Sequence, residues 1–431
     1  MGPSLTYIKL VIASQGQGQK RRKQLKTLLF ILLGKGDVML GRLFSDGYRV
    51  FFLAAGLSAV AVVLVWEFYL GVHATGGMMT GLPFAMPPHV WHAHELVFGY
   101  GAAALTGFLY TAVPSWTGRP PVGRGVIVAT ATLWLAGRIA VWMSGALPGW
   151  LVAVLDLGHV PLLLAVVTAM LWHRPKAKNL VFPLLLALFW LANLATHLGW
   201  AGLWDDGEAI GLRAGMMALA GMILVIGRMT PAFTRNAMMR EASTARRPRD
   251  WARAGPVMIG FAALLPVAAL AAPDSPVTAS LMIAAGVAQL IRQSRWGWRF
   301  AATRPILASL HLSVAMLALG LILTGLSVFT GLSEVAGLHV LGIGGIGGMT
   351  LAVMSRATLG HSGLPLIAPV PIALAYGALP LAALMRWIAS EAGGAAYFPA
   401  TLTAGALWIA AFTAFTATLW PAFWGERAGG E

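Results

Sequence analysis

Apolar stretches of 18 or more residues recur along nearly the whole chain, and this pattern constrains the fold more than any other feature. Each stretch is long enough to cross the hydrocarbon core of a bilayer as an α-helix. Of the 431 residues, 58% are hydrophobic and only 10% are charged, whereas a soluble protein carries about 25% charged residues. The strand-like alternation of a membrane β-barrel is absent. The sequence therefore predicts an all-α polytopic membrane protein with its helices in one bundle.

The pattern predicts twelve transmembrane helices, which together form one domain over residues 46–425. The expected spans are 50–70, 93–114, 123–143, 151–172, 179–203, 211–233, 254–272, 277–291, 305–329, 333–355, 366–389 and 398–423. Residues 1–45, which contain the run "KRRKQLK", are expected to be a variable basic N-terminal extension.

Lysine and arginine are concentrated at the amino terminus and in the loops after the second, fourth, sixth, eighth and tenth spans. The intervening loops are acidic or neutral, such as "WDDGE" at 204–208. Because basic loops stay in the cytoplasm, both termini are predicted to be cytoplasmic. The net charge of +15 is then explained by membrane orientation, so lipid is the expected partner and nucleic acid is not.

The chain has no cysteine. This excludes disulfides, iron–sulfur clusters and cysteine-ligated metals. Any bound metal must be held by histidine, carboxylate, methionine or tyrosine.

Histidines on three predicted spans lie at a similar depth near the outer face. The stretch "PPHVWHAHELVFGY" places His92 and His94 at the outer end of the second span, while His197 and His339 are about 9 Å deep at the rise of an α-helix. Ionisable groups in a membrane usually face the bundle interior or a cavity, and imidazole suits copper, zinc and haem iron. These four histidines are therefore candidate metal or cofactor ligands. The alternative is that they form structural hydrogen bonds between helices.

His92 and His94 are separated by about 200° on an ideal helix, so they cannot both face one point if the helix is continuous. Glu95 lies three residues after His92 and is a candidate to hold that ring from the second coordination shell. Alternatively, Glu95 is an anion favoured by the helix dipole.

Two further features have both a functional and a structural interpretation. Gly342, Gly344, Gly345, Gly347 and Gly348 would suit either close helix packing or a flat macrocycle beside its ligand. A second polar centre on the cytoplasmic side contains Arg228, Arg356 and His361, and His311 also lies towards that side. Its arginines would suit carboxylates such as haem propionates, or simply anchor the helix ends.

Several stretches together resemble the NnrS family of bacterial inner-membrane proteins. They are "GYRVFFLAAG" at 47–56, "WHAHELVFGYGAAALTGFLYTAVPSWTG" at 91–118, "ANLATHLGW" at 192–200, "GRMTPAFTRN" at 227–236, "RPILASLHLS" at 304–313 and "GLHVLGIGGIGGMTLAVMSRATLGHSG" at 337–363. The resemblance extends over about residues 45–425.

The resemblance implies a haem- and copper-containing protein of the bacterial inner membrane that acts in the nitric oxide response. Redox chemistry on nitric oxide would need electrons from a quinol or a small donor protein. On this hypothesis His94 and His339 are the expected axial ligands of a b-type haem, and His92 and His197 are the next choice, for copper. His311 and His361 form a second-choice pair, and Arg228 and Arg356 are expected to bind anionic groups.

Two other classes of function remain open. One is a transporter or metal-handling permease whose histidines coordinate a transient substrate. The other is an assembly or sensory partner whose histidines are structural.

Overall fold

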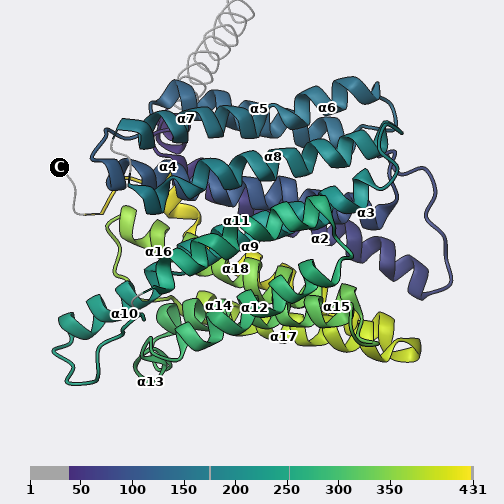
Figure 1. The fold of residues 1–431 in the computed structure, drawn as a ribbon. Coiled ribbons are helices and arrows are strands. Elements are labelled where there is room, and N and C mark those ends of the chain that lie inside the picture. Colours follow the sequence, from purple (N-terminus) through teal and green to yellow (C-terminus); the bar gives the residue numbers. More distant parts are fainter. Residues whose placement is uncertain (1–37, 174–175, 252, 429–431) are drawn as a thin grey trace, which may run out of the picture.

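The computed structural model describes residues 38–173, 176–251 and 253–428, and all regular structure in these ranges is helical. Within these described residues, eleven helical spans are long and apolar enough to cross a membrane, so the protein is a multi-pass membrane protein. Figure 1 shows how the helices are arranged. The spans are Gly47–Ala74, Pro88–Thr117, Arg124–Trp142, Gly149–His173, Val181–Trp200, Gly207–Arg240, Ala254–Ala271, Pro305–Ser327, Glu334–His361, Val370–Ala392 and Gly394–Trp424. The predicted N-terminal extension lies outside the described residues up to position 37.

Two spans are interrupted by π-helical segments, and each segment starts directly after a histidine. The second span consists of α3 (Pro88–His94), η1 (Glu95–Gly101) and α4 (Ala102–Thr117). The span Glu334–His361 consists of α15 (Glu334–His339), η3 (Val340–Gly347) and α16 (Gly348–His361). π-Helical segments are rare in proteins, and those that occur are often at functional sites. Their position directly after His94 and His339 therefore supports a functional role for these two histidines.

The remaining helices are α2 (Gly47–Ala74), α5 (Arg124–Trp142), α6 (Gly149–Leu157), α7 (His159–His173), η2 (Ala177–Asn179), α8 (Val181–Trp200), α9 (Gly207–Ile226), α10 (Met229–Arg240), α11 (Ala254–Ala271), α12 (Pro276–Gln293), α13 (Trp298–Ala301), α14 (Pro305–Ser327), α17 (Val370–Ala392), η4 (Gly394–Ala396) and α18 (Tyr397–Trp424). The long helices among them overlap the predicted spans, whereas the short helices η2, α13 and η4 lie outside them or at their edges.

Eleven of the twelve predicted spans are apolar enough to cross a membrane, and the eighth differs in composition. The eighth predicted span, 277–291, is present as α12, which packs against α11 and α14. It is not among the eleven apolar spans because its 18 residues include polar groups such as Gln289, Arg292 and Gln293. The structure thus shows eleven candidate membrane-crossing helices with α12 packed beside them.

Local signals explain where helices begin. Pro88, Pro276 and Pro305 occupy the first turn of α3, α12 and α14, where proline costs no hydrogen bond. Ser275 and Ser333 accept hydrogen bonds from the first-turn amides of Val277 and Ala336, each at 3.2 Å. The apolar runs between these signals form the helices.

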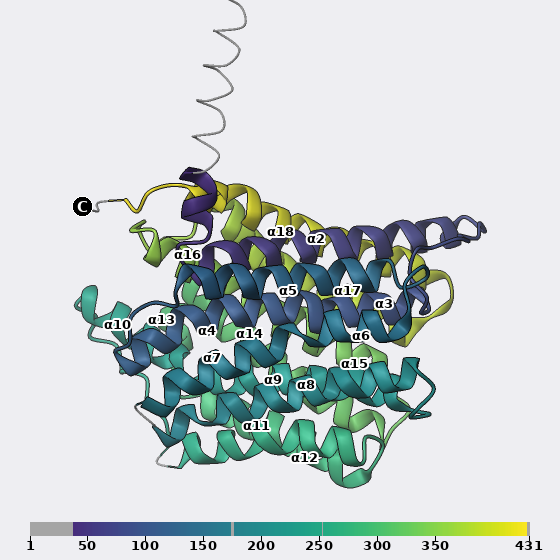
Figure 2. The same cartoon turned by 90° about the horizontal axis from the view of Figure 1, so that it is seen from above.

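The spans run side by side, which gives the bundle two distinct ends (Figures 1 and 2). We call one the histidine end, where α3 and α15 begin and α8 finishes. We call the other the basic end, where α10 and α16 finish and α13 lies. Both ends of the described chain are at the basic end, where Arg42 pairs with Glu426.

Small residues let the helices approach closely. A Cβ atom at Gly221 of α9 would lie 2.5 Å from the carbonyl oxygen of Ala262 in α11, and one at Gly320 of α14 would lie 2.5 Å from the Cα of Leu341. Large apolar side chains such as Phe68, Trp150 and Leu374 are instead exposed on the outside of the bundle. This inside–outside pattern is that of a membrane helix bundle, in which packing depends on close contact and lipid covers the rest.

Candidate metal and cofactor sites

A cavity of about 510 Å³ lies inside the histidine end, and we call it the histidine-end cavity. Its walls come from α2, α3, η1, α9, α15, η3, α17 and α18. His92 of α3 and His339 of α15 both line it. The volume is within the range of sites that hold cofactors and drug-sized ligands.

The two imidazoles have nitrogen atoms available for a ligand. His339 Nδ1 lies 2.7 Å from the carbonyl oxygen of Val335, so this nitrogen is the donor and Nε2 carries the lone pair. His92 stacks on Trp66 with ring centroids 4.9 Å apart, and its buried Nδ1 has no partner among the described residues. A ring fixed through one nitrogen by a backbone carbonyl is the usual arrangement of a metal-ligating histidine.

The cavity also contains charged side chains from the membrane spans. Glu67, Arg213 and Arg386 line it. Arg213 is neutralised by Asp274 at 3.0 Å and Glu334 at 2.7 Å. Arg386 is only 8% exposed and donates to Ser390, but no ion pair joins it to a carboxylate of the described residues. Arg386 is thus a buried cation well suited to an anionic group in the cavity.

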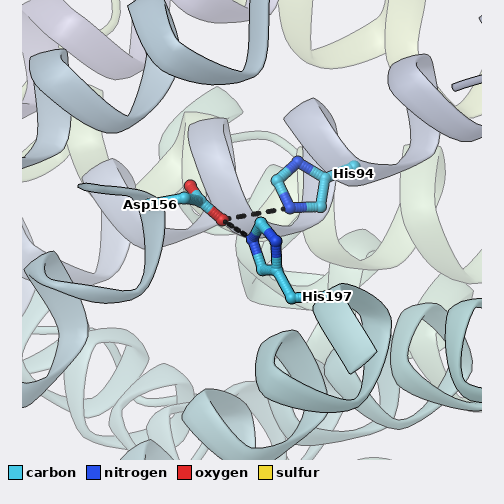
Figure 3. A group of neighbouring side chains, drawn as sticks. All are labelled: His94, Asp156 and His197. Carbon is cyan, nitrogen blue, oxygen red and sulfur yellow. Dashed lines mark hydrogen bonds and ion pairs between the residues drawn. The ribbon is translucent and has the colours of Figure 1, made fainter. Parts of the chain in front are cut away.

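A second group of histidines lies close by but outside this cavity (Figure 3). His94, Asp156 and His197 are buried, and each offers a ligand atom within 4.8 Å of the others. His197 Nε2 is 2.8 Å and His94 Nε2 is 3.2 Å from the same carboxylate oxygen, Oδ2 of Asp156. We call these three residues the His–Asp cluster. Imidazole nitrogen and carboxylate oxygen are ligands for zinc, copper and iron.

A second layer of polar residues surrounds the His–Asp cluster. Arg138 donates to Glu95 at 2.5 Å and also to Asp156, while Asn193 donates to Asp156 Oδ2 at 2.8 Å. Two carboxylates face one guanidinium, which leaves one negative charge when both imidazoles are neutral. A buried net charge is unfavourable unless a cation compensates it.

His94 adds an independent argument for a cation. Its Nδ1 is 3.2 Å from Glu95 Oε1, and its Nε2 is 3.0 Å from Asn193 Oδ1. Both ring nitrogens therefore face oxygen acceptors, whereas a neutral imidazole has only one N–H. The second nitrogen is satisfied only by a second proton or by a metal ion. The residues present fit a metal ion in this position.

The structure separates the four outer histidines into two pairs. His92 and His339 share the histidine-end cavity, and His94 and His197 share the His–Asp cluster. The predicted axial pair, His94 with His339, is not brought together in either site. The separation of His92 from His94 follows from their positions on one helix turn, as the angle of about 200° requires. Glu95, the proposed partner of His92, contacts His94 instead.

The predicted polar centre at the basic end is also divided. His311 bonds Thr234 at 3.0 Å, whereas His361 stacks on Tyr48 with ring centroids 5.5 Å apart. Arg228 donates to Lys178 O at 2.8 Å and Asn179 Oδ1 at 2.7 Å, so it caps a chain turn. The other predicted anion-binding arginine, Arg356, lines a cavity of which Arg228 is not part.

The glycine run of η3 serves mainly for helix packing. A Cβ at Gly345 would lie 2.7 Å from Leu317 Cα, and one at Gly347 would lie 2.5 Å from the Trp408 ring. Gly342 differs, because it lines the histidine-end cavity and its added Cβ would meet only Met216 Cε at 3.7 Å. One glycine of the run thus leaves room beside His339.

The residues that sequence reasoning missed are charged or polar groups within spans, namely Glu67, Arg138, Asp156, Asn193 and Arg386. A signal was present, because "LVAVLDLGHV" and "VVLVWEFYLG" each contain one carboxylate in an apolar run. Such a residue in a membrane helix is by itself a functional candidate.

Comparison with known proteins identifies a family for almost the whole chain. The model of the family described as "NnrS protein" matches residues 42–427. No curated protein matches the chain. The family match covers every residue of the histidine-end cavity and of the His–Asp cluster, and the chain therefore belongs to the NnrS family.

Proposed function

We propose that this protein binds haem in the histidine-end cavity and a copper ion at the His–Asp cluster, and that it acts in the nitric oxide response of a bacterial inner membrane. The observation that carries the haem assignment is the shared cavity of His92 and His339. Haem is a large, flat, mainly apolar ligand with two carboxylates. The cavity offers the imidazoles of His92 and His339, a small-residue wall at Gly342 and the buried cation Arg386.

The chain's own residues would divide the tasks. His92 and His339 would hold the iron from two different helices, and the carbonyl of Val335 would fix the tautomer and orientation of His339. Arg386 would pair with a propionate. When bound, haem supplies an iron centre that takes small ligands such as nitric oxide and exchanges electrons.

At the His–Asp cluster, His94, Asp156 and His197 would be the metal ligands. Glu95 would hold the Nδ1–H of His94 from the second shell, and Arg138 would hold both carboxylates. The His–Asp cluster together with Glu95 and Arg138 carries one net negative charge. A singly charged ion such as Cu(I) would make the site neutral, whereas a divalent ion would give it a net charge of one positive unit. A redox role would require an electron donor, either a quinol or a small protein, as a further partner.

The test is to purify the protein in detergent and record oxidised and dithionite-reduced visible spectra, with copper measured on the same sample. The expected result is the pair of sharp reduced bands of a b-type haem and about one copper per chain. A protein that stays colourless and metal-free after haem and copper are supplied would overturn the proposal.

A second candidate, a transporter or permease, is favoured by a different observation. Cavities of about 510 Å³ and about 420 Å³ lie towards the two ends of the bundle, and a narrow space of about 30 Å³ lies between them. Cavities on both sides of a constriction suit alternating access. Copper uptake into vesicles by a colourless protein would support this function instead of haem binding.

A further inference from the structure

The cavity at the basic end differs in chemistry from the histidine-end cavity. Its volume is about 420 Å³, and it lies among α2, α4, α10, α14 and α16. Much of its wall is aromatic, with Phe52, Phe108, Trp116 and Phe233. We call it the basic-end cavity.

All charged residues that line the basic-end cavity are basic. Arg356 lies inside, half-buried, while His361 and Arg427 are exposed at the mouth. No aspartate or glutamate is among the described residues that line it. This differs from the histidine-end cavity, where Glu67 and Glu334 accompany the arginines.

Arg356 differs from three other arginines of this end in its partners. Arg42, Arg292 and Arg304 each pair with a carboxylate. Arg356 lies over the Phe233 ring at 3.8 Å, and no hydrogen bond or ion pair joins it to another described residue. The face of its guanidinium is thus covered, while the N–H groups at its edge remain for a ligand.

The cavity continues inward as a narrow apolar space. The space of about 30 Å³ shares Phe52, Phe108 and Met349 with the basic-end cavity. Its remaining wall is apolar except for Thr350, and it leads towards Leu219 and Ile346 of the histidine-end cavity. The positive charge therefore lies within the basic-end cavity and at its mouth, and the narrow space beyond it is apolar.

We propose that the basic-end cavity binds a single-chain amphipathic anion, with its carboxylate or phosphate on Arg356 and its hydrocarbon chain directed inward. Arg356 would form a bidentate, charge-assisted bond to the anion, and Arg427 and His361 would contribute at the mouth. The apolar chain would be removed from water along Phe52 and Phe108. This inference goes beyond the haem and copper proposal and does not depend on it.

The absence of cysteine from the sequence allows a direct test of occupancy. Ser115 lines the cavity, so Ser115→Cys places the chain's single thiol there. The full-length protein in phosphatidylcholine nanodiscs is treated with a maleimide while dodecanoate or dodecyl phosphate is titrated. Saturable protection of the thiol is expected. Ser294→Cys, at an exposed position of the same end, is the matched control and should not be protected.

Three comparisons separate charge from apolar contact. Arg356→Gln in the Ser115→Cys protein should weaken protection by about tenfold or more, and Arg356→Lys by less, because lysine keeps the charge but loses the bidentate geometry. Arg235→Gln, at an exposed residue of α10 outside the cavity, should change nothing. Dodecanol and an uncharged short-chain quinone should protect poorly. Equal protection by these uncharged probes, or no protection by either anion, would overturn the proposal.

Nanodiscs that contain lysophosphatidylglycerol, an anionic lipid with one acyl chain, distinguish the source of the anion. Protection of the thiol without an added acid would identify a membrane lipid as the ligand. Protection only after an acid is added would identify a free amphiphile. In both cases Arg356→Gln must weaken the protection by about tenfold or more. The outcome is independent of haem, because the readout is alkylation of a thiol and not a spectrum.

Discussion

The two histidine sites at one end of the bundle differ in how completely their polar atoms are satisfied. In the histidine-end cavity, His92 and His339 border open space, and the cation Arg386 has no carboxylate ion pair among the described residues. In the His–Asp cluster, carboxylates, an amide and a guanidinium surround two imidazoles at hydrogen-bonding distance. The first arrangement suits a large ligand that supplies its own carboxylates. The second suits a single ion that replaces one proton.

The largest expected effect tests whether the two sites are separate. His339→Ala should reduce the haem content to below about a tenth, because losing an iron ligand would cost more than the ~1.4 kcal/mol that corresponds to tenfold. His92→Ala should act in the same way. His94→Ala should keep the haem and lose copper. The haem and copper contents of the three purified variants provide the measurement. If His94→Ala loses haem while its size-exclusion profile stays normal, His94 is a haem ligand, as the sequence predicted.

The next effect concerns the charges of the His–Asp cluster. Asp156→Asn should lower the free energy of unfolding by about 3–5 kcal/mol, because it breaks a buried ion pair and leaves Arg138 less compensated. Thermal unfolding in detergent measures this. Adding Arg138→Leu to Asp156→Asn should recover part of the loss. If Asp156→Asn is as stable as the parent protein, Asp156 is not ionised in the cluster.

The glycines of η3 allow a comparison of space with packing. Gly342→Leu should fill part of the histidine-end cavity and prevent haem binding while the fold is retained. Gly345→Leu should destabilise the bundle by about 3 kcal/mol or more, because its Cβ would lie 2.7 Å from the backbone of Leu317. Haem titration and thermal unfolding of both variants separate the two effects. Equal destabilisation would mean that Gly342 also serves for packing.

A smaller effect is expected from the charge that faces the cavity. Arg386→Gln should weaken haem binding about tenfold, as expected for one charge-assisted hydrogen bond of ~1.5–3 kcal/mol. Haem titration of the apoprotein provides the affinity. The haem affinity of Arg386→Lys should lie between the affinities of the parent protein and of Arg386→Gln. An unchanged affinity in Arg386→Gln would exclude a bond between Arg386 and a propionate.

The smallest effect is expected at Glu241, whose exposed ion pair with Arg304 is a control for the buried pair of Asp156 and Arg138. The Arg304 guanidinium holds the pKa of Glu241 below its ordinary value through a hydrogen bond. A carboxyl whose pKa is lowered by folding stabilises the protein above its unfolded pKa, and that stabilisation disappears as the pH falls through the folded value. Glu241→Gln should therefore remove a small acid sensitivity below about pH 4.5 and leave the unfolding temperature at neutral pH nearly unchanged. A loss at neutral pH as large as that of Asp156→Asn would mean that burial does not distinguish the two pairs.

Helix positions were largely predictable from sequence because each apolar run is itself long enough to form a span. The predicted span 254–272, for example, corresponds to α11 at Ala254–Ala271. The eighth span illustrates the limit, since α12 forms as predicted but carries Gln289 and Arg292 among its apolar residues. Length and periodicity identify a helix, whereas membrane crossing depends on composition.

The candidate sites were only partly predictable, because depth along a helix does not reveal which helices are neighbours. His94 and His339 have similar predicted depths, yet His94 lies beside Asp156 of α6 and His339 faces the cavity with His92. The angle between His92 and His94 did indicate two separate directions. Asp156 and Arg386 needed a different rule, which treats every lone charge within a span as a candidate.

The π-helical segments after His94 and His339 have a consequence for how this protein tolerates change in length. A π-helical turn accommodates one residue more than an α-helical turn, so its hydrogen bonds run from each residue to the fifth rather than the fourth along the chain. Removing one residue from 95–101 or 340–347 would convert such a turn to α-helix without breaking the span, and would turn the preceding histidine by about 100°. The direction of each imidazole and the packing of the rest of its helix are therefore adjustable separately. A single-residue deletion at either segment is a way to re-aim one ligand while the bundle behind it keeps its contacts.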